Sequence, residues 1–357
     1  KCRECSHTVS DQAFSCPGCG APYPARPKWD GWGYEYKSNA TFLGLPLLHI
    51  SFKYRPNRMP VVAKGVIDCA YESTINISPV IPEANVFHLP FFINTFDNLD
   101  KMKAGQSGQA VFASMQKVGL QPLAWAENGF RQVTNSKRPI EKPEDLKGLR
   151  IRVVGNPMFM DTFRQLGADP VNMNWGDAQT AFQQGVVDGQ ENPVGVLIPV
   201  QIYQYHQYAT MWNYLVDPLV IYWNQKQWKA FPPDIQKAVQ EAAQESGRFE
   251  IALCRAGLDG EKSINVLKNE FNYTMEVPDP VKYMESKVMT VSFLTPDQVK
   301  AFADVTAPVV EKWAQELGAE LVGPVGGQTT GHRVAVLVIV RTGDVPQAAD
   351  VGIVPAT

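Results

Sequence analysis

The sequence has no long hydrophobic run, little net charge and few cysteines outside one short segment. Its 357 residues include 33 basic and 36 acidic side chains, a formal net charge of −3, so the basic surface that nucleic acid requires is missing. The longest clean apolar run, residues 334–340, is far shorter than the roughly 18 residues of a bilayer span. Hydrophobic residues make up 45% of the chain, which excludes wholesale disorder and leaves a globular protein of two or three domains.

Cysteine is scarce after residue 19, where only Cys69 and Cys254 occur, but four cysteines are crowded ahead of that point. They are Cys2, Cys5, Cys16 and Cys19. Two C-x-x-C pairs separated by ten residues predict a tetrahedral four-thiolate zinc site, whose closed shell leaves no position for water and is therefore structural. The alternatives are two disulfides in a secreted chain or redox-active pairs.

With these ligand positions, residues 1–30 resemble the zinc-ribbon family, which implies an interaction module of the reducing cytoplasm. Residues 31–65 are expected to form a short β-rich linker segment, with strands over 41–54 and 59–67 joined by the turn 55–58.

From residue 66 to residue 322 the pattern changes to apolar strands alternating with amphipathic helices, which predicts an α/β domain. We expect strands over 123–125 and 149–154, and helices over 98–117, 157–166, 177–184 and 233–270. A final helix is expected to begin at Thr295-Pro296-Asp297, a capping residue followed by proline at the first turn. Residues 323–357 form a tail of unknown role.

Four motifs of this α/β domain are similar in order and spacing to those of one family. They are residues 82–91 (PEANVFHLPF), 128–131 (NGFR), 146–153 (LKGLRIRV) and 188–193 (DGQENP). The domain thus resembles the extracytoplasmic solute-binding proteins of tripartite ATP-independent periplasmic (TRAP) transporters, the DctP type. The resemblance implies a small organic acid as ligand, the membrane subunits of a TRAP transporter as partner, a periplasmic location and no chemistry on the ligand.

The resemblance also implies an α/β, periplasmic-binding-protein-like fold whose two lobes close over the ligand. Lobe one is expected over about 66–124 and 213–255, and lobe two over about 125–212 and 256–322. A complete member begins with a strand, a helix and a second strand before residue 65, where this chain has the ribbon segment. We therefore expect a truncated first lobe, preceded by the small N-terminal zinc ribbon.

Arg152 matches the ligand-clamping arginine of the family. A guanidinium offers two parallel N–H donors that fit the two oxygens of a carboxylate. Arg150 is expected to be a solvated or structural charge. Arg131 matches a second basic contact, although a structural ion pair with Glu127 or Asp145 is an open alternative.

The remaining ligand contacts are carried over position by position. They are the amide of Asn192, the ring of Trp175 as a pocket wall, Asn213 and Tyr214 where the family has Asn-His, and Glu72 and Ser73 from the other lobe. Asp188 and Glu191 are expected to serve as turn and hinge structure, because acids in the pocket would repel an anion.

Enzyme signatures are missing from the sequence. Ser107 lacks the G-x-S-x-G spacing of a nucleophile elbow, and residues 326–333 lack the lysine of a phosphate loop. The favoured function is binding of a small carboxylate, and no cofactor is expected for the binding domain. The alternatives are a cytoplasmic zinc-ribbon interaction protein and a mosaic chain without selected function. The indications of the compartment conflict. The family resemblance implies the periplasm, whereas a thiolate zinc site and a start without a recognisable signal peptide favour the cytoplasm.

Overall fold

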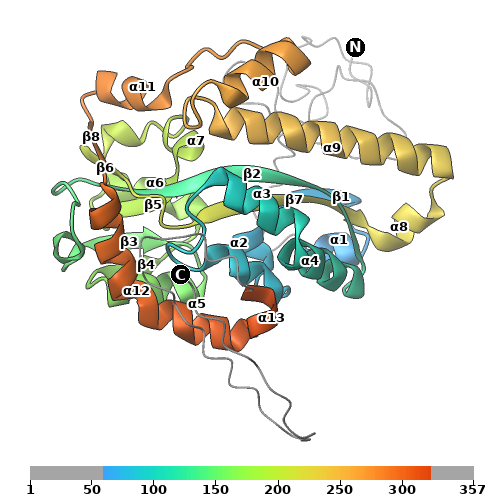
Figure 1. Ribbon diagram of the computed structural model, residues 1–357, viewed down its shortest axis with the longest axis horizontal. Helices are drawn as coiled ribbons and strands as arrows, with labels where there is room; N and C mark the ends of the chain where they lie inside the picture. Colours follow the sequence, from blue (N-terminus) through green and yellow to red (C-terminus); the bar gives the residue numbers. More distant parts are fainter. Residues whose placement is uncertain (1–58, 323–357) are drawn as a thin grey trace, which may run out of the picture. The chain divides into compact units, whose positions relative to one another are not determined.

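The computed structural model describes residues 59–322 (Figure 1). The predicted zinc ribbon with Cys2, Cys5, Cys16 and Cys19, the expected strand over 41–54 and the tail 323–357 lie outside the described residues.

The described residues form an eight-stranded sheet. Its strands are β1 (Cys69–Ser73), β2 (Leu120–Asn135), β3 (Arg150–Val153), β4 (Asp169–Asn172), β5 (Gly189–Pro193), β6 (Tyr208–Met211), β7 (Val216–Asn224) and β8 (Thr290–Phe293). The strand order is β1-β7-β2-β5-β3-β4, with β6 paired to both β2 and β8.

Helices lie before, between and after these strands. The α-helices are α1 (Met59–Ala63), α2 (Thr74–Ile77), α3 (Phe96–Ala104), α4 (Gln106–Lys117), α5 (Pro157–Gln165), α6 (Trp175–Gln183), α7 (Val194–Leu197), α8 (Gln225–Ala230), α9 (Pro233–Arg255), α10 (Lys262–Phe271), α11 (Pro280–Ser286), α12 (Pro296–Leu317) and α13 (Ala319–Val322). Three short 3₁₀ helices in the same part of the chain are η1 (Pro82–His88), η2 (Pro143–Leu146) and η3 (Ile202–Gln204).

Strand β2 belongs to both halves of the sheet. Its first part, residues 120–130, pairs antiparallel with β7, which in turn pairs with β1. Its last part, residues 131–135, pairs antiparallel with β5, and residues 133–135 pair with β6. A register irregularity between Glu127 and Gly129 lies close to the change of partner. The two halves of the sheet are therefore joined through one continuous strand.

Helix α9 runs along β2 (Figure 1). The approach is close at Gly247, where an added Cβ would lie 2.2 Å from the carbonyl oxygen of Trp125. Only glycine allows this distance between a helix and a strand, so Gly247 sets how tightly α9 packs on the shared strand.

Two large apolar clusters lie on the two halves of the sheet, and helix α12 contributes to both. One cluster contains Phe87, Val220 and Tyr222, and α12 adds Val309 to it. The other contains Phe163, Trp212 and Tyr214, and α12 adds Phe302. This helix begins with a capping box in which Thr295 accepts from the backbone N–H of Gln298, as the sequence predicts.

Most predicted elements of the α/β domain are present, including β3, α5, α6 and α12. The prediction of a strand over 59–67 is wrong, because Met59 and Val62 are buried at helical spacing in α1. The single helices predicted over 98–117 and 233–270 are each divided in two. Gly105 has extended backbone between α3 and α4, and residues 256–261 separate α9 from α10, with Gly257 and Gly260 at positive φ.

Candidate functional site

The sheet places three of the predicted contact residues on neighbouring strands. Arg131 lies in β2, Asn192 in β5 and Arg152 in β3, and these strands are consecutive in the sheet. The register pairs Arg131 with Pro193, next to Asn192, and pairs Arg152 with Gln190. Strand pairing thus gathers residues that are up to 61 positions apart in the chain.

Arg131 is buried and every nitrogen of its guanidinium donates to a protein oxygen. Nη1 donates to Oδ2 of Asp217 at 3.1 Å, and Nη2 donates to Oε1 of Glu191 at 2.9 Å and to Oδ1 of Asn192 at 3.0 Å. Nε donates to Oε2 of Glu191. Burial acts to lower the pKa of Arg131, but the charges of Glu191 and Asp217 raise it above its ordinary value. Arg131 is therefore a permanent cation that two acids already neutralise.

These two acids extend the network to both sides. Ser73 donates its hydroxyl to Asp217, and the amide of Asn128 donates to Oδ2 of Asp217 at 3.0 Å. The hydroxyl of Tyr214 donates to Oε2 of Glu191 at 2.6 Å. We call this group the Arg131 cluster; its members are Ser73, Asn128, Arg131, Glu191, Asn192, Tyr214 and Asp217. It unites β1, β2, β5 and β7, and so includes both halves of the sheet.

Arg152 is also buried, with 2% of its surface exposed, but its partners are different. Its Nε and Nη2 donate to the backbone carbonyl of Met173 at 2.9 and 2.6 Å, and its guanidinium carbon lies 5.3 Å from the centre of the Trp175 ring. Nη1 and the second hydrogen of Nη2 form the outer edge of the guanidinium, which can take both oxygens of a carboxylate.

The charge of Arg152 is poorly compensated by the protein. Of the three arginines buried within residues 59–322, Arg131 and Arg255 pair with carboxylates and Arg152 has none within 4 Å. Burial lowers the pKa of Arg152 to about 10, Glu191 acts to raise it and the neighbouring Arg131 acts to lower it. A buried cation without an anion is costly unless a ligand supplies the opposite charge.

Two predicted contact residues stand apart from this arrangement. Asn213 is exposed at a φ of 49°, and its side chain accepts from the amide of Gln132 at 2.6 Å. Glu72 is buried in β1, where its Oε2 accepts from the hydroxyl of Tyr222 at 2.7 Å. Gln132 and Tyr222, the partners of these two side chains, are not members of the Arg131 cluster.

The acidic residues differ from their predicted roles. The expected alternative partners of Arg131 are wrong: Glu127 pairs with Arg255 and Lys103, and Asp145 accepts from the backbone near Glu141. Glu191 belongs to strand β5 rather than to a turn. Its ion pair with Arg131 neutralises its charge, so the expected repulsion between an acid in the pocket and an anionic ligand is reduced. Asp188 does have a structural role, because it pairs with the half-exposed Arg150 at 2.9 Å.

Asp217 and Asn128 were not among the predicted contacts, although a feature of the sequence could have indicated each of them. Asp217 is the one charged residue of the otherwise apolar strand β7, where an acid needs a buried partner. Asn128 stands in the same short motif as Arg131.

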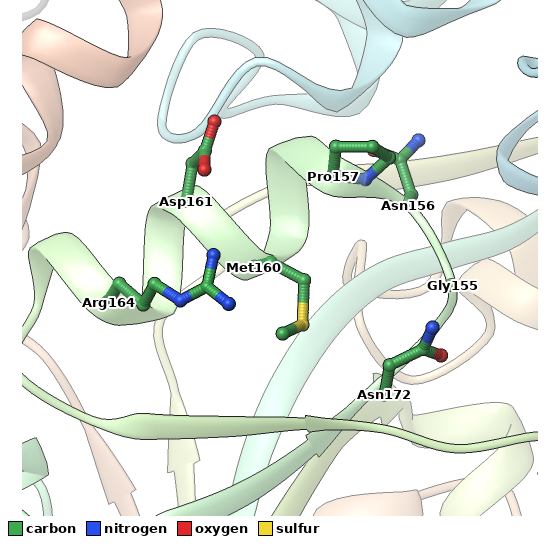
Figure 2. A pocket seen from close by; sticks show the side chains of 7 residues that line it. All are labelled: Gly155, Asn156, Pro157, Met160, Asp161, Arg164 and Asn172. Carbon is green, nitrogen blue, oxygen red and sulfur yellow. The ribbon is translucent and has the colours of Figure 1, made fainter.

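A cavity of about 220 Å³ lies beside the start of α5. Its lining consists of Gly155, Asn156, Pro157, Met160, Asp161, Arg164 and Asn172. Figure 2 shows Met160 projecting from α5 toward the side on which Asn172 lies, whereas Asp161 points the other way. Asp161 accepts from Lys312 at 2.8 Å. None of the predicted contact residues lines this cavity, which is therefore distinct from the arginine site.

Within residues 59–322, no group of three or more His, Cys, Asp or Glu side chains is placed to hold a metal ion. In the same part of the chain, no helix has the length and apolar character needed to cross a membrane.

A mixed α/β sheet whose halves share one strand, with one buried arginine on that strand and another two strands away, is typical of the periplasmic-binding-protein-like class. The more particular assignment follows from comparison with known families. The family described as bacterial extracellular solute-binding protein, family 7 (DctP) matches residues 54–259, and the chain belongs to this family. Members are solute-binding proteins of transport systems rather than enzymes.

Solved structures of this family have the same fold. A TRAP periplasmic solute-binding protein from Ralstonia eutropha H16, crystallised with (S)-2-acetolactate, is 41% identical, with a TM-score of 0.69 over 76% of this chain and 82% of that one. Another from Polaromonas sp. JS666, bound to D-erythronate, is 29% identical, with a TM-score of 0.64 over 75% of this chain and 82% of that one. The mixed α/β, periplasmic-binding-protein-like fold expected for the domain is thereby confirmed.

Curated relatives include the 2,3-diketo-L-gulonate-binding periplasmic protein of Escherichia coli, 30% identical over 58% of this chain. The C4-dicarboxylate-binding periplasmic protein DctP of Rhodobacter capsulatus is 24% identical over 74% of this chain. The matches span 62% and 74% of the lengths of these two relatives.

Proposed function

We propose that this protein binds a small organic acid at Arg152 and delivers it to the membrane subunits of a TRAP transporter. The observation that carries the proposal is the buried guanidinium of Arg152, which has no carboxylate partner within residues 59–322. The acids bound by the relatives support a carboxylate ligand, since erythronate and diketogulonate carry one carboxylate and succinate carries two.

The surroundings of Arg152 suit a small carboxylate. The Met173 carbonyl fixes the guanidinium on its Nε side, so the opposite edge is directed before a ligand arrives. Trp175 covers a face of the same group and can also contact the carbon chain of the ligand. Asn192 accepts from Arg131 through its oxygen and donates one amide hydrogen to Oε1 of Gln190, so it supplies its second amide N–H on the adjacent strand. We assign Arg152, Trp175 and Asn192 as the direct contacts.

Arg131 then acts as a support rather than as the main clamp, because Glu191 and Asp217 already occupy its donors. It holds together strands from both halves of the sheet around the ligand. A periplasmic location and the transport partner follow from family membership as part of this proposal.

Isothermal titration calorimetry with a panel of organic acids tests the proposal, using D-erythronate, lactate, gluconate and succinate. At least one acid is expected to bind the full chain, and Arg152→Met is expected to weaken it by about 100-fold, the loss of roughly 3 kcal/mol of charge-assisted hydrogen bonding. The matched control is Arg150→Met, on the same strand and paired with Asp188 at the surface. Failure of every acid to bind, or equal loss in both variants, would contradict the proposal.

A further inference from the structure

We infer that this site accepts organic acids with a single carboxylate and disfavours dicarboxylates, with Asp217 as the specificity-determining residue. The inference rests on the proposed function and names the class of ligand within it.

The first step is the number of cations that a ligand can use. A dicarboxylate needs two positively charged or strongly donating positions, one for each end. Arg131 and Arg152 would be the obvious pair, because they lie on strands separated only by β5 and the charge of Arg131 acts to lower the pKa of Arg152. Arg131, however, donates from all three of its nitrogens to Glu191, Asp217 and Asn192. Arg131 keeps one N–H of Nη1 beyond these bonds, whereas Arg152 offers a whole edge of its guanidinium, so of the two arginines only Arg152 can hold a carboxylate by two parallel bonds.

The second step is the charge of the group as a whole. Burial raises the pKa of Asp217, although the charge of Arg131 acts to lower it. With both acids ionised, Glu191 and Asp217 balance the two positive charges of Arg131 and Arg152, and the ligand-free group is neutral. A monoanion bound at Arg152 adds one negative charge, and a dianion adds two. Glu191 and Asp217 are both buried, so a second carboxylate brought toward Arg131 would meet two acids that water screens little, and like charges repel strongly there.

The third step assigns the preference for monocarboxylates to Asp217 rather than to Glu191. Glu191 is held by Arg131 and by the hydroxyl of Tyr214 on its own half of the sheet. Asp217 comes from β7 in the other half and is fixed there by Ser73 and Asn128. It reaches across to Nη1 of Arg131, and so occupies the donor that a second ligand carboxylate would use.

The experiment measures affinities for matched pairs of acids with the same carbon skeleton. The probes are succinamate with succinate, gluconate with glucarate, and lactate with malonate, titrated into the wild-type full chain by calorimetry. In every pair that binds, we expect the monocarboxylate to bind at least about tenfold more tightly. A dicarboxylate that binds as tightly as its partner would overturn the inference while supporting the proposed function, whereas no binding by any acid would overturn the proposed function itself.

The variant Asp217→Asn keeps the shape of the side chain and removes its charge. It is expected to reduce the preference for monocarboxylates by about tenfold, because the group then has one negative charge fewer to repel a second carboxylate. Asp304→Asn, which makes the same charge change in an exposed ion pair with Lys300 on α12, should leave the preference unchanged. An unaltered preference in Asp217→Asn would overturn the role of Asp217. The wild-type comparison tests the ligand class even where this variant does not fold.

Discussion

Arg255, the last residue of α9, donates two hydrogen bonds to Glu127 in the middle of β2. Its Nε donates to Oε1 at 3.0 Å and its Nη2 to Oε2 at 2.6 Å, and Glu127 is fully buried. The same guanidinium also bonds both oxygens of Asp100 in α3. The end of the long helix, the shared strand and α3 are therefore fastened at one point.

Arg255→Met is expected to lower the free energy of unfolding by about 3 kcal/mol, because Glu127 would keep a buried charge with only the 3.4 Å contact to Lys103. Urea unfolding followed by circular dichroism measures the change. Lys300→Met, which removes an exposed ion pair with Asp304, should change the stability by less than about 0.5 kcal/mol. Equal stabilities of the two variants would show that the Arg255–Glu127 pair contributes nothing net.

Two buried histidines predict a loss of stability in mild acid. Burial lowers the pKa of both His88 and His206 from 6.5 to about 3, with the charge of Arg131 adding to the effect at His88 and that of Asp188 opposing it at His206. The unfolded chain therefore binds protons below pH 6.5 that the folded chain does not, and stability rises with pH across this window.

Between pH 7.5 and pH 5.5 the expected loss is about 1.4 kcal/mol for each histidine. Urea unfolding at the two pH values measures it, and His206→Asn should lose less stability than the wild type by about one histidine's share. An identical pH dependence in the variant would mean that His206 takes up its proton in the folded state.

The four N-terminal cysteines, which lie outside the described part of the chain, are predicted to bind zinc. A four-thiolate site at Cys2, Cys5, Cys16 and Cys19 predicts about one zinc per chain by elemental analysis. Replacing Cys2 and Cys16 by Ser should abolish the zinc, whereas Cys69→Ser should retain it, because Cys69 is a free thiol in strand β1. Purified zinc-free protein with these four cysteines in disulfides would contradict the prediction.

The sequence predicted those parts of the fold and site that depend on neighbours along the chain. Strand β3 with Arg152 stands within one continuous motif, and the start of α12 is encoded in a local capping box. Family membership and the α/β fold could be inferred in the same way. The shared strand β2 was predicted as only three residues, because its pairing with β7 and β5 arises between distant segments.

The electrostatics of the site depend on such distant pairings even more. Asp217 is 86 positions from Arg131 and 144 from Ser73, and no local pattern indicates that the three meet. Glu191 was set aside as a repulsive acid because its neutralising partner lies 60 positions away. Divisions at Gly105 and at residues 256–261 were missed for a related reason, since helical periodicity continues across them.

The continuity of β2 has a consequence for how the domain comes apart. Its 16 residues complete the hydrogen-bonding of β7 along the first part of the strand and of β5 and β6 along the last part. Opening either half of the sheet therefore removes partners from the other, and the free energies of the two openings cannot be independent. The described part of the chain should melt as one cooperative unit, so that a ligand bound at Arg152 raises the resistance of the distant β1–β7 edge to amide exchange as well.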